Sequence, residues 1–447
     1  MSRTDHAPWR IWIGAGALAA LLALGACGDR SQRSAEPAPA AAPAEQSADT
    51  VPSARGLDAS AVARLDETLA ALAASQDRSG YVAVIARDGV IQHVSEAGYA
   101  DVGAGAPMRA DTVVRIASMS KPVTAAAILI LAEDGVLSVT DPVSDYIPAF
   151  ANARVATQLM HDENFEIPTE PLARPITIED LLTHTSGVGY IFDYQTHLGA
   201  LYIDRDIYRA GEQSLEERIN TLAGLPLYFQ PGERWFYSYS NDILGQVIAA
   251  ASGQSVEDFM QARLFQPLGM SDSSFFPGEV QRERLAALYT HDEDGTLVRV
   301  AGERDVAVSA PVEAGGAGLF STANDYLRFA QMLANGGELD GVRVMSADSV
   351  AAMVTPHVGL DRMGEGQRRI GLAFGYSVGV SVNEDGGRRI GDFGWGGYFD
   401  TAFVVSPATG VVAVIMAQEE PGPGTRDTTS AGEVLQSQLA GLIPVES

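Results

Sequence analysis

The stretch Ser118-Met119-Ser120-Lys121-Pro122 decides how the rest of the chain is interpreted. It precedes the apolar run TAAAILILAED at 124–134, which predicts a helix with Ser118 or Ser120 as its N-cap and Pro122 in its first turn. At this spacing the hydroxyl of Ser118 and the amine of Lys121 share one helix face. A neutral amine there can take the serine proton as the oxygen attacks a carbonyl carbon. The spacing alone also fits a capping serine beside a surface lysine.

The composition is that of a large globular protein with an acidic surface. The chain has 447 residues, 46% of them hydrophobic, and a formal net charge of -27. A chain of this length can bury a large core. Its negative charge repels phosphate backbones, which excludes nucleic acid as a partner. The 7 histidines show no spacing typical of metal ligands, and we predict no cofactor.

The N-terminal segment has the features of an export signal. Basic residues precede the apolar run IWIGAGALAALLAL at 11–24, which is too short for a comfortable membrane span. The following LGAC resembles the lipobox of bacterial lipoproteins, in which the cysteine, here Cys27, is acylated. We therefore predict a lipoprotein signal over 1–27, a cell-envelope location facing the periplasm, and a membrane contact through this lipid anchor alone. An ordinary signal peptide cleaved after Ala26 is the alternative.

The hydrophobic patterning of the remaining chain predicts its organisation. Residues 28–55 are rich in Ala, Pro, Ser and Glu and form a predicted tether. Strand-like segments over about 56–120 and 330–447 enclose a mostly helical stretch over about 121–330. This order predicts one α/β domain completed by the C-terminus, with an inserted helical part. The predicted terminal elements are a helix over 58–75, strands over 81–87, 90–94, 375–382, 401–405 and 410–417, and a helix over 428–442.

The run YSYSNDILG at 237–245 leads into another predicted helix and contains two candidate catalytic tyrosines. A phenol beside Ser118 and Lys121 could relay a proton to the leaving group. Tyr239 begins a Y-x-N triplet, whereas Tyr237 stands eight residues before Gly245. We predict that Tyr237 is the catalytic tyrosine. Aromatic packing within a loop is the alternative.

Glycines adjoin an apolar strand in the run Trp395-Gly396-Gly397-Tyr398. Glycine beside a strand lets a ligand lie against the backbone. We predict that the backbone N–H groups of Ser118 and Tyr398 stabilise a developing oxyanion. A bulge or a hairpin turn is the alternative.

Together these motifs resemble the serine β-lactamase and penicillin-binding-protein superfamily over roughly 57–443. The closer likeness is to its esterase-like branch, the family VIII carboxylesterases and relatives of class C β-lactamases. The matching segments are Ser118 to Lys121 (S-x-x-K), LLTHTSG at 181–187, YSYSNDILG at 237–245, GGAGL at 315–319 with Ser321-Thr322, and Trp395-Gly396-Gly397, which stands where β-lactamases carry K-T-G. The resemblance implies a β-lactamase-like fold: an antiparallel sheet flanked by N- and C-terminal helices, plus an inserted all-α domain.

The resemblance also implies a serine hydrolase that forms an acyl-enzyme through Ser118, Lys121 and Tyr237. Two substrate contacts depart from the β-lactamase pattern: Tyr239 replaces the asparagine of Y-x-N, and Trp395 replaces the cationic lysine of K-T-G. Both changes favour neutral small or medium esters, because a cation that would bind a carboxylate is replaced by an aromatic wall.

Two other activities remain open from the sequence. One is a β-lactamase or D-amino-acid peptidase, with Arg388 or Arg389 supplying the missing cation. The other is a penicillin-binding envelope lipoprotein that is acylated without turnover.

Several charged residues near these motifs are predicted to be structural. His184, within the T-H-T-S-G segment, is expected to hydrogen-bond backbone rather than to act as a base. Arg115, Glu179 and Asp180 are expected to form ion pairs or helix caps.

Overall fold

The computed structural model describes residues 56–75, 78–209, 211–300, 312–384, 387–423, 425 and 430–443. They belong to one compact unit, Pro52–Ser447. The predicted signal, the Cys27 anchor and the tether over 28–55 lie outside the described residues and stay predictions. Within the described ranges, no helix is both long and apolar enough to cross a membrane.

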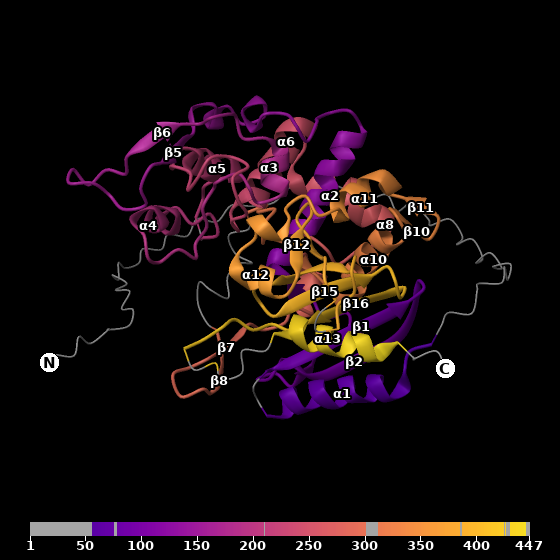
Figure 1. Cartoon of the computed structure of the whole chain (residues 1–447). Coiled ribbons are helices and arrows are strands. Elements are labelled where there is room, and N and C mark those ends of the chain that lie inside the picture. Colours follow the sequence, from indigo (N-terminus) through magenta and orange to yellow (C-terminus); the bar gives the residue numbers. More distant parts are fainter. Residues whose placement is uncertain are drawn as a thin grey trace, which may run out of the picture. The chain divides into compact units, whose positions relative to one another are not determined.

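The centre of this unit is an antiparallel sheet of eight strands, as the resemblance implies (Figure 1). From edge to edge the strands are β12 (Leu372–Phe374), β13 (Gly379–Ser381), β14 (Phe393–Gly397), β15 (Thr401–Ser406), β16 (Val411–Met416), β1 (Gly80–Arg87), β2 (Val90–Asp101) and β3 (Ala106–Pro107). A strand from the beginning of the described chain and one from near its end therefore lie side by side in the middle of the sheet, where β16 pairs with β1 along Val82–Arg87.

The central strands β1, β15 and β16 are buried along their whole length and mostly apolar because both faces of the sheet are covered there. Successive side chains of a strand point to opposite faces, so a sheet buried on both sides needs apolar residues at every position. Along β1, two separate cores receive alternate residues: Tyr81, Ala83 and Ile85 on one face, and Val82, Val84 and Ala86 on the other.

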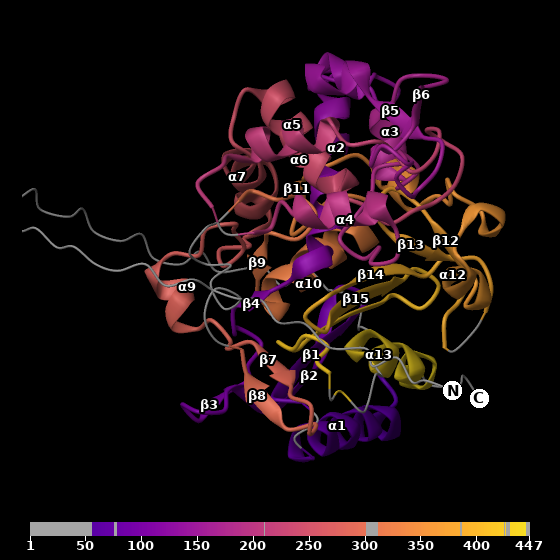
Figure 2. The same cartoon turned by 90° about the vertical axis from the view of Figure 1, so that its left-hand side faces the viewer.

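The two terminal helices cover one of these faces, as predicted (Figure 2). They are α1 (Ala59–Ala74) and α13 (Ala431–Leu439), which continues as a 3₁₀ turn over Ala440–Leu442. Asp58 caps α1 by accepting the Ala61 N–H at 2.9 Å.

The other face carries the helical part of the chain. Helix α10 packs against β15 and β16, and α2 packs against α6. The helices are α2 (Ser120–Glu133), α3 (Ile178–Leu182), α4 (His197–Asp204), α5 (Leu215–Ala223), α6 (Ser240–Ser252), α7 (Val256–Met260), α8 (Gln266–Leu268), α9 (Glu279–Glu283), α10 (Ala323–Ala334), α11 (Ala347–Val354) and α12 (Glu365–Arg369). Short antiparallel pairs complete the fold: β4 (Val114–Arg115) with β9 (Phe320–Ser321), β5 (Arg154–Ala156) with β6 (Thr169–Pro171), β7 (Tyr289–His291) with β8 (Leu297–Arg299), and β10 (Glu338–Leu339) with β11 (Val342–Arg343).

Two predicted strands have other bounds in the structure. The stretch predicted over 375–382 contains only the short β13, Gly379–Ser381. The strand predicted over 90–94 extends to Asp101, because its second half pairs with the beginning of β1: Gly80 faces Gly98 and Val82 faces Glu96.

A buried ion cluster lies behind the turn that joins β14 to β15. Arg78 Nε lies 3.1 Å from Asp400 Oδ2 and 3.3 Å from Glu419 Oε2, and the Tyr81 hydroxyl donates to Asp400 Oδ2 at 3.2 Å. The Glu419 carboxylate also accepts the Ser79 N–H. Burial raises the pKa of Glu419 to about 8, although the bond from the Ser79 N–H and the charge of Arg78 act to lower it.

The raised pKa of Glu419 predicts a pH-dependent stability. Because its folded pKa exceeds the ordinary value of 4.5, the folded chain binds more protons than the unfolded chain between those two values. The free energy of unfolding should therefore fall as pH rises through this window. We expect the melting temperature to decrease between about pH 5 and about pH 9, and Glu419→Gln to reduce that decrease.

Calorimetry over this pH range measures the effect. Glu233→Gln, the same charge change at an exposed position, is the control. Equal pH slopes for wild type and Glu419→Gln would contradict the assignment.

Candidate active site

Ser118 lies in a 3₁₀ turn, Ala117–Met119, that runs directly into α2. The predicted N-caps are wrong: α2 begins at Ser120, and its N-cap Met119 makes no side-chain capping bond. The Ser120 hydroxyl instead accepts the Leu319 N–H at 3.2 Å. Ala117 has φ 43°, a left-handed conformation that costs a non-glycine residue about 1–3 kcal/mol. Backbone strain is thus stored immediately before the serine.

The amine of Lys121 is completely buried and faces this serine. Its Nζ lies 3.2 Å from Ser118 Oγ and donates to the Gly316 carbonyl at 2.7 Å. The same Nζ lies 4.6 Å from the ring centroid of Tyr237 and 5.6 Å from that of Tyr190. A hydroxyl, one strong acceptor and two aromatic rings therefore surround the amine.

The glycine pair Gly315-Gly316 is pressed between α2 and α6. A Cβ on Gly315 would lie 2.5 Å from the Asn241 carbonyl oxygen, and a Cβ on Gly316 would overlap the Asp242 carboxylate. The Gly315 carbonyl accepts the Thr124 hydroxyl at 2.7 Å. Only residues without side chains let this loop bring a carbonyl to Lys121.

The two candidate tyrosines occupy different surroundings. Tyr237 is half-buried, with its ring against Lys121 and 5.9 Å from the ring of Trp395. Tyr239 has no exposed surface, and its hydroxyl donates to Asp206 Oδ1 at 3.1 Å. The structure brings the Tyr237 ring to Lys121, whose amine faces Ser118, but it leaves Tyr239 without exposed surface.

The end of β14 lies against the turn that carries Ser118. A Cβ on Gly397 would overlap the Ile116 carbonyl oxygen, and the Thr401 hydroxyl donates to the same oxygen at 3.3 Å. Strand β13 pairs with β14 only at Gly394 and Phe393, so among the described strands β15 alone pairs with Trp395–Gly397. This leaves a free strand edge beside the serine.

Aromatic side chains that the sequence reading missed line the approach to this edge. Tyr190 lies with ring centroids 5.4 Å from Tyr237 and 4.9 Å from Phe192. Phe192 in turn lies 6.4 Å from Tyr398, and these two outer rings are 50% and 46% exposed. A row of rings thus leads from the surface to Lys121. The only sequence signal was a Tyr-x-Phe pair shortly after the T-H-T-S-G segment.

His184 packs against the catalytic candidate Tyr237 and bonds to Ser238. Its Nδ1 lies 2.9 Å from the Ser238 hydroxyl, so the prediction that this side chain bonds backbone is wrong. Complete burial, with a further contribution from the Lys121 charge, holds the pKa of His184 well below its usual range. Its ring centroid lies 4.9 Å from that of Tyr237. The histidine is therefore a neutral packing partner of this tyrosine.

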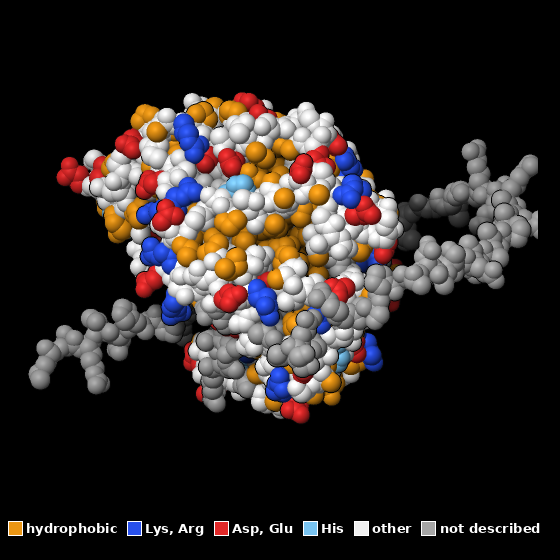
Figure 3. All heavy atoms as spheres, turned by 45° about the vertical axis from the view of Figure 1, so that its right-hand side comes forward, with side chains coloured by type: hydrophobic (Ala, Val, Ile, Leu, Met, Phe, Trp, Pro, Cys, Tyr) orange, Lys and Arg blue, Asp and Glu red, His pale blue; other side chains and the backbone are white. Residues whose placement is uncertain are grey.

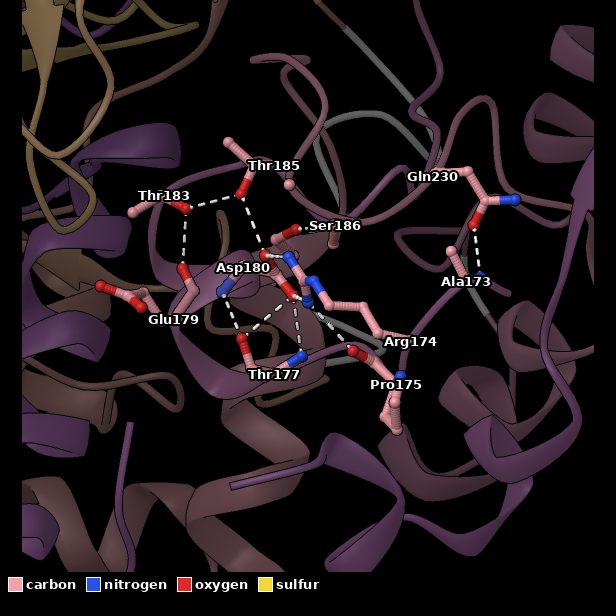
Figure 4. Close-up of polar contacts among 12 residues, drawn as sticks. Ala173, Arg174, Pro175, Thr177, Glu179, Asp180, Thr183, Thr185, Ser186 and Gln230 are labelled. Atoms are coloured by element: carbon pink, nitrogen blue, oxygen red, sulfur yellow. Dashed lines mark hydrogen bonds and ion pairs between the residues drawn. The ribbon is translucent and has the colours of Figure 1, made fainter. Parts of the chain in front are cut away.

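Asp180 is structural, as predicted, and fixes the turn that presents His184 (Figure 4). It forms a capping box with Thr177, and its two carboxylate oxygens bind Arg174 at 2.6 and 2.8 Å. The Thr185 hydroxyl donates to Asp180 Oδ1 at 3.3 Å. Glu179 and Arg115 are also structural: Glu179 accepts the Tyr376 hydroxyl, and Arg115 donates to the Ala286 carbonyl.

A cavity of about 310 Å³ adjoins the free strand edge and reaches helix α13, with Tyr237, Trp395, Gly396, Phe393, Leu372, Arg388 and Leu435 among its lining residues. Among the described residues, Ser118 and Lys121 do not line this cavity. Hydrophobic side chains also gather over the middle of the face drawn in Figure 3. In the part of the chain that the structure describes, no group of three or more His, Cys, Asp or Glu could hold a metal ion.

The close approach of Gly397 to the serine turn can be tested directly. A Cβ in Gly397→Ala must push β14 away from Ile116, and a displacement near the reacting atoms costs on the order of 100-fold in rate. We expect kcat/KM for an ester to fall by about that factor.

Gly396→Ala is the matched variant, because its Cβ would first meet the Thr401 carbonyl oxygen at 3.3 Å. It should lose much less activity. Equal losses in the two variants would show that the Gly397 contact is not what holds the edge.

Comparisons with known proteins show what the chain is similar to. The family model described as Beta-lactamase matches residues 65–436. Esterase EstB of Burkholderia gladioli is 33% identical over 394 residues, which cover 82% of this chain and 92% of the relative. Penicillin-binding protein 4 of Amycolatopsis lactamdurans is 30% identical over 78% of this chain and 83% of its own length.

Solved structures show the same fold. One is the hydrolase EstCE1, described as having promiscuous acyltransferase activity. The match covers 86% of this chain and 99% of EstCE1, with a TM-score of 0.70 and 24% identity. Simvastatin synthase (LovD) from Aspergillus terreus covers 85% and 99%, with a TM-score of 0.71 and 22% identity.

Proposed function

The chain belongs to the β-lactamase family and is a serine hydrolase, and from that premise we propose that it is a carboxylesterase for neutral esters. The observation that carries the proposal is the buried Lys121 amine, 3.2 Å from the Ser118 hydroxyl with the Tyr237 ring over it. A relative named as an esterase, EstB, supports the substrate class.

In the proposed mechanism, Ser118 Oγ attacks the ester carbonyl while the neutral Lys121 amine takes its proton. Tyr237 relays that proton to the departing alkoxide, so the C–O bond breaks as an alcohol is released. The backbone N–H groups of Ser118 and Tyr398 stabilise the tetrahedral oxyanion. Water then attacks the acyl-enzyme, the same groups transfer its proton back, and the carboxylic acid leaves.

Removing the serine hydroxyl tests the chemistry. We expect Ser118→Ala to abolish hydrolysis of p-nitrophenyl butyrate while the melting temperature stays near that of wild type. Ser120→Ala, which removes a hydroxyl that only accepts the Leu319 N–H, should retain most activity. Full ester turnover by Ser118→Ala would exclude the mechanism.

A second activity, hydrolysis of β-lactams or D-peptides, has one observation in its favour. Arg388 lines the same cavity as Trp395 and Tyr237, which puts a cationic side chain in the neighbourhood of these two residues. A third reading, acylation without turnover, predicts that a penicillin remains bound to Ser118. Intact-mass spectrometry after incubation with penicillin would detect such a stable adduct.

The side chain at Trp395 is predicted to set the preference between esters and β-lactams. Its ring packs 5.2 Å from Phe374 and 5.9 Å from Tyr237, which makes an apolar wall. Trp395→Lys would supply a donor to a substrate carboxylate, an interaction worth about 1.5–3 kcal/mol. We expect the ratio of kcat/KM for nitrocefin to that for p-nitrophenyl butyrate to rise by at least about tenfold.

Trp395→Leu is the control, because it removes the aromatic wall without adding charge. It should lower ester turnover without raising nitrocefin turnover. The same ratio in both variants would show that charge at this position does not decide the substrate.

A further inference from the structure

Asp242 has a completely buried carboxyl group and has no part in the mechanism above. A single residue, Gly316, separates this carboxyl group from the Lys121 amine. Asp242 Oδ1 accepts the Gly316 N–H at 2.9 Å. The carbonyl of the same glycine accepts the Lys121 amine at 2.7 Å. The two bonds therefore link the carboxylate to the amine through a single residue.

The geometry points to Asp242 as a positioning residue that holds Gly316 so that its carbonyl aims the Lys121 amine at Ser118, and that supplies a negative charge to the ammonium formed when the serine proton is taken. The inference rests on the proposed function. It parallels the way a buried carboxylate orients a catalytic base and stabilises the cation that the base becomes.

The fit around Gly316 makes this link rigid. A Cβ on this glycine would overlap the Asp242 carboxylate, so backbone and carboxylate are in direct contact. Thr124 holds the preceding carbonyl, that of Gly315, at 2.7 Å. Both bonds hold the same peptide group, the one that joins Gly315 to Gly316. The Gly316 carbonyl belongs to the next peptide group, and this fixed neighbour orients it toward the Lys121 amine.

The charges around Asp242 favour an interaction with Lys121 alone. The titratable groups that face it are Lys121 of α2, Tyr190, Tyr208 and Tyr239, and the Tyr208 hydroxyl donates to Asp242 Oδ2 at 2.9 Å. Burial raises the pKa of Tyr190 and Tyr208 well above its usual range, so both phenols stay neutral. The ammonium that Lys121 becomes when it takes the serine proton is then the cation beside this carboxylate.

The protonation of Asp242 falls in a range that enzyme assays cover. Burial raises its pKa to about 6, while the Lys121 charge and the bonds from Gly316 and Tyr208 act to lower it. Above this value the carboxylate is negative and can stabilise the ammonium. Below it the charge is lost, and the rate should fall with it.

Two variants with opposite expected shifts test the proposal. Asp242→Asn retains an oxygen for the Gly316 N–H but has no charge to lose, so the acid limb of kcat/KM against pH should move to lower pH, and the maximum should fall about tenfold or more. Tyr208→Phe removes a donor to the ionised carboxylate, which raises the pKa of Asp242, so the acid limb should move to higher pH.

Asp206→Asn is the matched control. Asp206 accepts the Tyr239 hydroxyl and the Tyr208 N–H in the same cluster, with no bond to Gly316 in any described contact. Its acid limb should coincide with that of wild type. An acid limb that moves in neither Asp242→Asn nor Tyr208→Phe, whatever the loss of stability, would overturn the proposal. If Asp242→Asn does not fold, the shift in Tyr208→Phe alone decides.

The positioning role of Asp242 can be tested even if the proposed esterase function is wrong. A wild-type protein that hydrolyses no ester would exclude the esterase and leave the positioning role testable, because a fluorophosphonate probe labels an activated serine directly. Slower labelling of Ser118 in Asp242→Asn than in Asp206→Asn would support the role of Asp242. Equal labelling rates would overturn it.

Discussion

The burial of the Lys121 amine is the constraint on which the rest of the site depends. An amine without exposed surface destabilises the fold unless a strong acceptor meets it, and the Gly316 carbonyl does so at 2.7 Å. That acceptor can approach only because Gly315 and Gly316 lack side chains. The bond from the Lys121 amine therefore ties the glycine loop to α2, and the missing side chains let the same loop pack against Asn241 and Asp242 of α6.

The opposite wall of the site depends on a second close approach. Strand β14 reaches the serine turn through Gly397, and the turn that follows it ends at Asp400, which has φ 62°. This strained residue belongs to the buried cluster of Arg78 and Glu419. A paired, desolvated ion cluster is costly to rearrange. It therefore resists displacement of the hairpin whose strand β14 approaches the serine turn at Gly397.

Local patterns predicted those parts of the molecule that depend on neighbours in sequence. The apolar runs of β1 and β16, the helix after Ser118 and the pairing of Ser118 with Lys121 all follow from periodicity and spacing. The choice of Tyr237 over Tyr239 followed from motif spacing and stays a prediction; in the structure the Tyr237 ring lies 4.6 Å from Lys121 Nζ, and Tyr239 has no exposed surface.

Other parts depend on contacts between distant segments, which no local pattern carries. Tyr190 and Phe192 reach the site because the loop after His184 lies against the segment before α6, where the Gly189 carbonyl accepts the Tyr239 N–H. Asp242 reaches Gly316 across 74 residues. The N-cap prediction failed for a different reason. The 3₁₀ turn before α2 supplies the first backbone bonds of the helix, so the serine hydroxyls are not needed as caps.

In the proposed esterase, the residues near Ser118 decide the charge of the substrate, rather than the electric field of the whole chain. A net charge of -27 repels carboxylates at long range, but salt at physiological strength screens exposed charges beyond about 8 Å. Inside the pocket, screening is weak, and each missing donor matters more. There the row of rings from Tyr398 to Tyr237 and the wall of Trp395 offer dispersion contacts and no cation of their own. A neutral acyl group loses little hydration free energy on entering such a site. A carboxylate loses much more, and it needs a compensating cation such as Arg388, which lines the neighbouring cavity.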